Sequence, residues 1–189
     1  MKILYFDTET TGRDPIKNGL IQLSGIIEVD GRVEEEFNFK VAPFETDEID
    51  DEALKVNGIT REQLKSFTSP RKTFVLIEQL FNRYIQRFDK TDKFYPAGYN
   101  VRFDIDFLNQ FFKKNFNDYF GSYCNWRSID AFPLVHYLNY RGYFSLSNYK
   151  LSTICDYFEI KIQAHDAMSD IRATRELLLK LREIIKIKK

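Results

Sequence analysis

The sequence opens with ILYFDTETTG at residues 3–12, an apolar run that turns abruptly acidic. Four consecutive apolar residues predict a strand that is buried on both faces. Residues two apart in a strand point to the same side, so Asp7 and Glu9 should project together from its end. Adjacent carboxylates repel one another unless a cation lies between them, and such a pair suits a hard divalent metal. For an isolated pair of this kind, a solvated strand end is the alternative.

Outward from this strand, the hydrophobic pattern predicts a regular order of strands and helices. Strands are expected at 20–29 and 33–41, joined by a hairpin turn at Asp30-Gly31, then at 92–99 and near 124–129. Helices are expected as two short pieces within 50–66, broken at Asn57-Gly58, and at 73–88, 102–115, 130–140, 150–158 and 168–186. Early antiparallel hairpin strands followed by alternating helices and strands indicate an α/β fold, a mixed sheet flanked by helices.

Composition narrows the class of protein. A chain of 189 residues with 43% hydrophobic residues suggests a single globular domain over 1–189. Its 28 basic and 28 acidic residues give no net charge, which argues against a protein that coats long stretches of nucleic acid. An enzyme that grips a few nucleotides is still compatible, because bound metal ions can supply positive charge locally.

The N-terminus, the length of the apolar runs and the number of cysteines indicate the cellular compartment. The N-terminus becomes acidic too soon for a secretion signal, and the apolar runs are too short to span a membrane. Cys124 and Cys155 are too few for a disulfide framework or a zinc site. We therefore expect two reduced thiols in a cytoplasmic protein with no membrane partner.

Two further aspartates fall on apolar helix faces. Asp104 lies on the predicted helix 102–115, on the same side as the apolar residues Phe107, Leu108, Phe111 and Phe112. Asp170 stands in the same relation to Ala173, Thr174, Leu177 and Leu181. An unpaired buried charge is costly, so both positions indicate a functional role. Asp106 faces elsewhere and is expected to be exposed or to cap the helix.

The chain has only two histidines. His165 precedes Asp170 by five residues, which places it in the loop before the final helix, where it could swing over the carboxylates. His136 lies in an apolar helix and is expected to pack.

Together these residues resemble the DEDDh exonucleases, the DnaQ-like family that includes bacterial proofreading subunits, ribonuclease T and oligoribonuclease. The three motifs that carry the resemblance span most of the chain: Asp7-Thr8-Glu9-Thr10-Thr11-Gly12, Asn100-x-x-x-Asp104 and His165-x-x-x-x-Asp170. The resemblance implies a ribonuclease H-like fold, in agreement with the predicted elements. Arg13, Asn57 and Tyr99 depart from residues common in the family, which leaves open how the terminal base is held.

The resemblance also implies a chemistry, a 3′→5′ hydrolysis of phosphodiester bonds that depends on two divalent cations. Asp7 would contact both ions, Glu9 and Asp170 would help hold the first, and Asp104 would serve the second. Mg²⁺ is the expected metal, and Mn²⁺ should substitute. His165 would act as general base, since its free pKa is near neutral.

The implied substrate is the 3′ end of a single strand, with DNA slightly favoured over RNA and 5′-mononucleotides as products. Thr10, Thr11, Gly12 and Asn100 would lie near the terminal nucleotide, although a plain strand-end turn explains the first three equally well. Trp126 and Tyr143 are candidates for stacking on bases. A separate polymerase subunit is a further possible partner, and the oligomeric state is open.

Two other readings remain on the same fold. One is a non-catalytic nucleic-acid-binding or polymerase-partner module, and the other is a ribonuclease H-type endonuclease. Retention of all four carboxylates and His165 argues against the first, and the spacing of His165 and Asp170 argues against the second.

Overall fold

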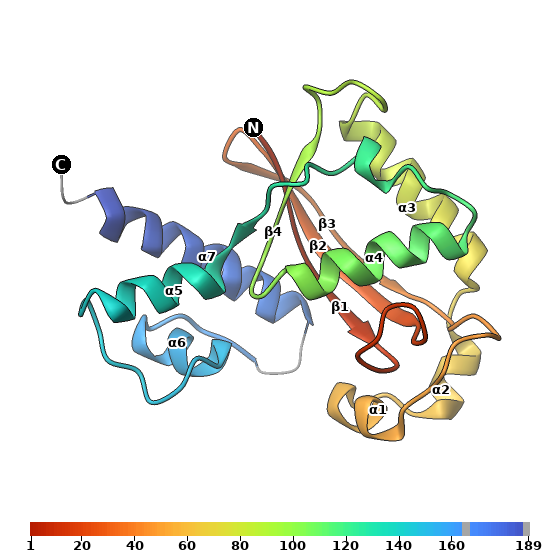
Figure 1. Ribbon diagram of the computed structural model, residues 1–189, viewed down its shortest axis with the longest axis horizontal. Coiled ribbons are helices and arrows are strands. Elements are labelled where there is room, and N and C mark those ends of the chain that lie inside the picture. Colours follow the sequence, from red (N-terminus) through yellow and green to blue (C-terminus); the bar gives the residue numbers. More distant parts are fainter. Residues whose placement is uncertain (164–166, 187–189) are drawn as a thin grey trace.

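Strand β1 (Lys2–Thr10) lies at the centre of a five-stranded sheet in the computed structural model, which describes residues 1–163 and 167–186. The strand order is β3-β2-β1-β4-β5 (Figure 1). The hairpin strands β2 (Leu20–Val29) and β3 (Arg32–Lys40) run antiparallel, whereas β4 (Phe94–Gly98) and β5 (Ile129–Asp130) run parallel to β1. The predicted mixed sheet is therefore confirmed.

Helices cover both faces of this sheet, as Figure 1 shows. One face carries α3 (Pro70–Tyr84) and α4 (Arg102–Lys114), and the other carries α5 (Ala131–Tyr140), α6 (Leu151–Tyr157) and α7 (Ala167–Lys186). Two short helices, α1 (Asp51–Asn57) and α2 (Arg61–Ser66), lie near the end of β1, and a 3₁₀ turn spans Phe120–Ser122. Within the described ranges, no helix combines the length and apolar character that a membrane span requires.

Alternation along β1 separates the two large hydrophobic cores on the two faces of the sheet. Leu4 and Phe6 pack into the core beneath α3 and α4, while Ile3 and Tyr5 pack into the core beneath α5, α6 and α7. Because side chains in a strand alternate between faces, Asp7 and Glu9 continue the row of Ile3 and Tyr5. The even-numbered row continues as Thr8 and Thr10, on the side of α4. The predicted burial of residues 3–6 on both faces is confirmed.

The third helix differs from its prediction over 73–88. It begins at Pro70, since the first helical turn tolerates proline, and it ends at Tyr84. Ile85 is extended and buried, so the residues after it no longer follow the helical spacing. Phe88, which the pattern had placed on the apolar face, is 62% exposed with a φ of 72°.

Two other expectations need correction. The strand predicted near 124–129 is reduced to Ile129 and Asp130, and Cys124 makes only an isolated bridge with Phe94. His136 does not pack into a core, because the inward face of α5 is formed by neighbouring apolar residues and the imidazole is left exposed. Its ring lies instead against Tyr149.

Candidate active site

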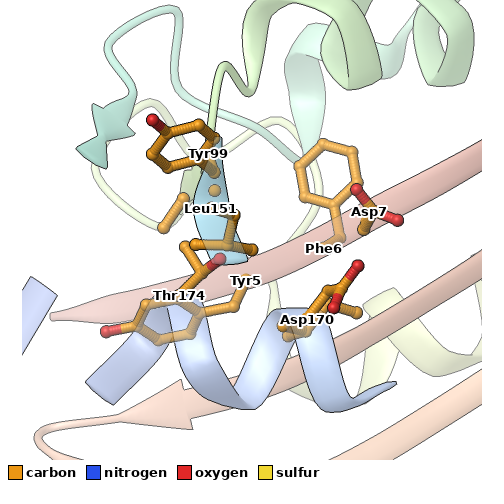
Figure 2. Close-up of a pocket in the computed structure, with 10 residues that line it drawn as sticks. Tyr5, Phe6, Asp7, Tyr99, Leu151, Asp170 and Thr174 are labelled. Atoms are coloured by element: carbon orange, nitrogen blue, oxygen red, sulfur yellow. The ribbon is translucent and has the colours of Figure 1, made fainter. Parts of the chain in front are cut away.

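The four predicted acidic residues come from three elements that meet at the end of β1. Asp7 and Glu9 lie on β1, Asp104 lies in the first turn of α4, and Asp170 lies in the first turn of α7. Figure 2 shows the carboxylate of Asp170 directed from α7 toward that of Asp7. Since α4 and α7 cover opposite faces of the sheet, the site lies where the two cores adjoin at the strand end.

Burial and mutual repulsion raise the pKa values of these groups. The pKa of Asp7 is raised well above its usual value, first by burial and then by the charges of Asp104, Glu9 and Asp170. Burial, followed by the charge of Asp170, raises the pKa of Glu9 to about 7. Burial also raises the pKa of Asp104 to about 7, even though hydrogen bonds from Thr8 act in the opposite direction. The cluster would be relieved by positive charge placed among its oxygens.

Thr8 fixes the position of Asp104. Its amide donates to Asp104 Oδ1 at 2.9 Å, and its hydroxyl donates to the same oxygen at 2.7 Å. The carboxylate is 4% exposed, so these charge-assisted bonds are its main compensation for lost hydration. Sequence reasoning missed Thr8, although its alternation with Asp7 and Glu9 places it on the α4 side of β1.

The donor set fits divalent magnesium by its chemistry, because all four side chains offer carboxylate oxygens that repel one another. Across residues 1–163 and 167–186, no three Asp, Glu, His or Cys side chains surround one point closely enough to form a ready ligand set. This spacing is compatible with Mg²⁺, which proteins commonly hold by one or two carboxylates together with waters and substrate phosphates.

His165, the predicted general base, lies outside the described residues, as do its two immediate neighbours. Asn100, another predicted site residue, is exposed and has a φ of 60°, a backbone conformation that asparagine adopts more readily than most residues. Its amide donates to Asp130 Oδ1 at 2.8 Å, which ties the end of β4 to the beginning of α5. Asp106 forms an ion pair with Arg102 one turn earlier on α4, away from the cluster.

The turn after β1 uses both threonine hydroxyls internally. Thr11 is fully buried, donates to the Glu48 carbonyl at 2.6 Å and accepts from the Gly19 amide at 2.8 Å. The Thr10 hydroxyl donates to the Gly12 carbonyl at 2.6 Å. These bonds explain the two threonines structurally, and contact of residues 10–12 with a nucleotide stays a prediction.

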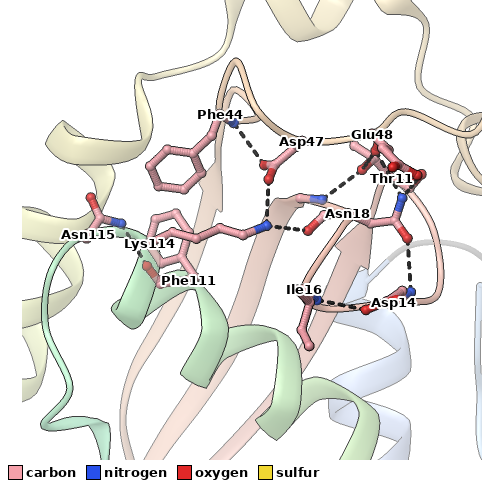
Figure 3. Close-up of polar contacts among 11 residues, drawn as sticks. Thr11, Asp14, Ile16, Asn18, Phe44, Asp47, Glu48, Phe111, Lys114 and Asn115 are labelled. Carbon is pink, nitrogen blue, oxygen red and sulfur yellow. Dashed lines mark hydrogen bonds and ion pairs between the residues drawn. The ribbon is translucent and has the colours of Figure 1, made fainter.

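A network of polar side chains packs against this turn (Figure 3). Lys114, at the end of α4, reaches Asp47 at 2.5 Å and the Asn18 carbonyl at 2.8 Å. The Asn18 carboxamide donates to the Glu48 carbonyl at 3.0 Å. It also lies so close to Gly12 that a Cβ there would come within 2.4 Å of it, so no larger residue fits without displacing the network. Sequence reasoning missed this network, which joins segments about one hundred residues apart.

Two cavities flank the carboxylates. The larger, about 410 Å³, borders Glu9 and is lined by Thr8, Thr10, Gly12, Arg13, Asp50, Glu52, Ala53, Val56, Asn57 and Phe103. Asn57 closes part of this cavity, and its side chain donates to the Thr10 carbonyl at 2.8 Å, which ties α1 to the end of β1. The smaller, about 210 Å³, contains Asp7 and Asp170 together with Tyr99, Leu151 and Thr174 (Figure 2).

The family model and the curated relatives that match this chain agree with each other. The model of the RNase_T family, described as exonuclease, matches residues 4–178. Among curated relatives, the PolC-type DNA polymerase III of Halalkalibacterium halodurans is 28% identical over 181 residues, covering 95% of this chain and 11% of the relative. The corresponding polymerase of Mycoplasmopsis pulmonis is 31% identical over 142 residues, covering 74% of this chain and 9% of the relative.

Solved structures agree in fold. Escherichia coli exonuclease I in complex with a dT13 oligonucleotide superposes with a TM-score of 0.79 at 23% identity, covering 98% of this chain and 42% of that one. Its complex with a dA16 oligonucleotide gives a TM-score of 0.76 at 23% identity, covering 95% and 40%. The chain thus spans about a tenth of the curated relatives' length and about two fifths of the structural ones.

Proposed function

Because the chain belongs to the exonuclease family, we propose that it hydrolyses single-stranded nucleic acid from the 3′ end and releases 5′-mononucleotides. The observation that carries this proposal is the convergence of Asp7, Glu9, Asp104 and Asp170 from β1, α4 and α7 on one strand end. Carboxylates that raise one another's pKa are kept together at a cost in stability, which suits a site for cations.

The electrostatic pattern supports specific roles for the four carboxylates. Asp7 is the group whose pKa is raised by all three others, and this central place suits a ligand shared between two ions. The pKa of Glu9 is raised first by burial and then by the charge of Asp170, and this neighbouring charge favours the two residues as ligands of a single ion. Asp104, held by Thr8 on the α4 side, would serve the other. When bound, two Mg²⁺ ions would supply charge stabilisation for both the attacking and the leaving oxygen.

The general base is proposed from the sequence motif. His165 precedes Asp170 by five residues, and Asp170 lies in the first turn of α7, beside Asp7. An imidazole near the cluster would take the proton from the attacking water, since its free pKa is close to neutral. This role rests on the sequence, because His165 lies outside the described residues.

A single strand is the proposed substrate for physical reasons. Asp104 is buried and the other three carboxylates are half-buried at the strand end, so a paired terminus would have to fray first, at about a few kcal/mol per unstacked nucleotide. A chain without net charge has little electrostatic binding energy to drive such melting. The oligonucleotide complexes of exonuclease I and the PolC-type polymerases among the relatives favour DNA, and a polymerase as partner is compatible with the latter.

The proposal is tested with end-labelled DNA and RNA oligonucleotides, single- and double-stranded, in Mg²⁺ and in Mn²⁺. We expect single strands to be shortened stepwise from a free 3′ hydroxyl, blunt duplexes to be cut more slowly, and EDTA to stop the reaction. A strand blocked at its 3′ end should persist, and one blocked at its 5′ end should disappear.

Two controls separate the alternatives. Asp7→Ala should lower turnover to below a few per cent while the protein remains folded, because the shared ligand is removed. A circular single strand should resist the enzyme, and its cleavage would instead indicate an endonuclease. Binding of the strand without metal-dependent release of nucleotides would indicate a non-catalytic module.

A further inference from the structure

Four aromatic rings lead from the smaller cavity to the protein surface. We call Tyr99, Phe132, His136 and Tyr149 the aromatic row. Tyr99 lines the cavity that contains Asp7 and Asp170 (Figure 2). Its ring meets that of Phe132 edge to face at 5.4 Å, and Phe132 meets His136 at 4.5 Å. His136 then lies face to face with Tyr149, with centroids 3.7 Å apart and planes 14° from parallel.

Hydrogen bonds hold the row in place. The Tyr99 hydroxyl donates to the Tyr149 carbonyl, and the Asn139 side chain donates to the Tyr149 hydroxyl at 2.7 Å. Asp130 accepts from the amides of Asn100 and Phe132, at 2.8 and 3.0 Å, and so fixes the end of β4 to the start of α5. The rings are therefore ordered before any ligand arrives, which lowers the entropy cost of binding.

Core packing accounts for Tyr99 and Tyr149, which are half-buried against the core beneath α5, α6 and α7, but not for His136. The inward face of α5 consists of Ala131, Val135 and Leu138, and His136 is exposed beside them. The exposed imidazole already stacks on Tyr149, and a nucleobase could extend this stack from the solvent side. Base–aromatic stacking is tolerant of sequence, because every base has a flat face.

Positive charge accompanies the rings. Lys150 directly follows Tyr149 and is exposed. Arg141, at the end of α5, is also exposed and donates to the hydroxyl of Tyr137 at 2.9 Å, a partner other than a carboxylate. Surfaces that bind single strands combine such cations with stacking rings.

We propose that the aromatic row binds the substrate strand a few nucleotides upstream of the bond to be cut, with a base on His136 and phosphates near Lys150 and Arg141. This inference rests on the proposed function, because continuity with the carboxylate cavity is what assigns the row to a nucleic-acid strand. The row then selects for substrate length, since a strand too short to reach His136 gains nothing from it.

Binding and turnover are measured separately, so that the two proposals can fail independently. Fluorescence anisotropy in EDTA gives the Kd for a labelled twelve-nucleotide strand and for a trinucleotide. Hydrolysis in Mg²⁺ is followed on the twelve-nucleotide strand and on the nitrophenyl ester of thymidine monophosphate, which cannot reach the row. His136→Ala removes the outer ring, His136→Phe keeps a ring, and Lys150→Gln removes the adjacent charge. Phe116→Ala, a 98% exposed ring beyond the far end of α4, is the matched control.

We expect His136→Ala to raise the Kd and the KM for the twelve-nucleotide strand by about tenfold, the loss of roughly one base stack. Its kcat and its rate on the ester should be unchanged, and His136→Phe should restore most of the affinity. Lys150→Gln should weaken binding of the long strand by about threefold and reduce its salt dependence. Phe116→Ala should behave as the wild type.

Long-strand affinity within twofold of wild type in both His136→Ala and Lys150→Gln would overturn the proposal. An equal loss on the trinucleotide and the ester would also overturn it, because the row would then act on the site itself. A wild type that binds the long strand through His136 but hydrolyses nothing would support the row and refute the proposed exonuclease activity.

Discussion

Asp104 and Thr8 are joined by two hydrogen bonds to a single carboxylate oxygen, one from the amide and one from the hydroxyl of Thr8. The bonds cross from α4 to β1, so the helix that carries Asp104 is fixed to the strand that carries Asp7 and Glu9. The proposed metal site thereby depends on a residue that offers it no ligand.

Thr8→Val should show this dependence, because it keeps the branched shape and the amide but removes the hydroxyl donor. We expect a fall in activity of about five- to thirtyfold at limiting Mg²⁺, from the loss of about 1–2 kcal/mol in a bond to a charged group. Activity measured over a range of Mg²⁺ concentrations gives the size of this loss. Thr8→Ser, which keeps the hydroxyl, is the control. Wild-type Mg²⁺ dependence in Thr8→Val would show that the hydroxyl does not position Asp104.

Stability should depend on pH through Glu9. Burial, followed by the charge of Asp170, raises the pKa of Glu9 from 4.5 to about 7, so the folded state favours its protonated form. This contribution is fully present below the unfolded pKa and is lost as pH rises through about 7. In EDTA, Glu9→Gln should match the wild type near pH 4.5 and exceed its unfolding free energy by about 1–3 kcal/mol at pH 8.

Urea unfolding at several pH values measures this difference. Saturating Mg²⁺ at pH 8 should stabilise the wild type more than Glu9→Gln, since the carboxylate then gains a cation. A difference between the two proteins that stays constant from pH 4.5 to pH 8 would contradict the assignment.

Gly12→Ala tests the packing of the turn. The new methyl group would come within 2.4 Å of the Asn18 carboxamide, which already bonds the Glu48 carbonyl. We expect a loss of about 1–3 kcal/mol in unfolding free energy from overpacking, together with reduced activity, because the turn follows directly on Glu9 and Thr10. Gly121→Ala is the matched control, since nothing lies within 4 Å of its Cβ position. Equal thermal stability of the two variants would argue against a closely packed turn.

His165→Ala should bind Mg²⁺ and substrate but turn over more slowly, by about 10²–10⁴-fold, as expected for a missing general base. The rate–pH profile should also lose the step on its acidic side that belongs to the imidazole. Coupled titration of the carboxylates overlaps that region, so the comparison is made at saturating Mg²⁺. An unchanged rate and profile in His165→Ala would assign the base to another residue.

The sequence predicted those features that repeat along one element. Alternation placed Asp7 and Glu9 on one side of β1, and helical spacing placed Asp104 on an inward face, because each pattern is local. Contacts between distant segments leave no such pattern. The bonds from Lys114 to Asp47 and Asn18 join three segments that become neighbours only in the folded chain.

The two wrong predictions, for Phe88 and His136, both come from extending a local pattern without knowing how the helix packs. Phe88 continued a helical spacing that had already ended, because Ile85 turns into the core in extended conformation. His136 has apolar neighbours in the sequence, and we therefore expected it to pack. It directly follows the buried Val135 on α5, so its side chain points away from the inward face of the helix.

The alternation of β1 has a consequence for how the chain finds its pairing. A slip of one residue against β2 and β4 would turn Asp7 and Glu9 to the side of α4 and Thr8 to the side of α7. The two carboxylates would then face the side of the phenylalanine-rich core, and Asp104 would lose its donors. A misregistered strand is therefore destabilised in two ways, because its apolar side chains leave their cores and its carboxylates turn to an apolar side. The carboxylates that we assign to chemistry thus also disfavour a wrong register of the central strand.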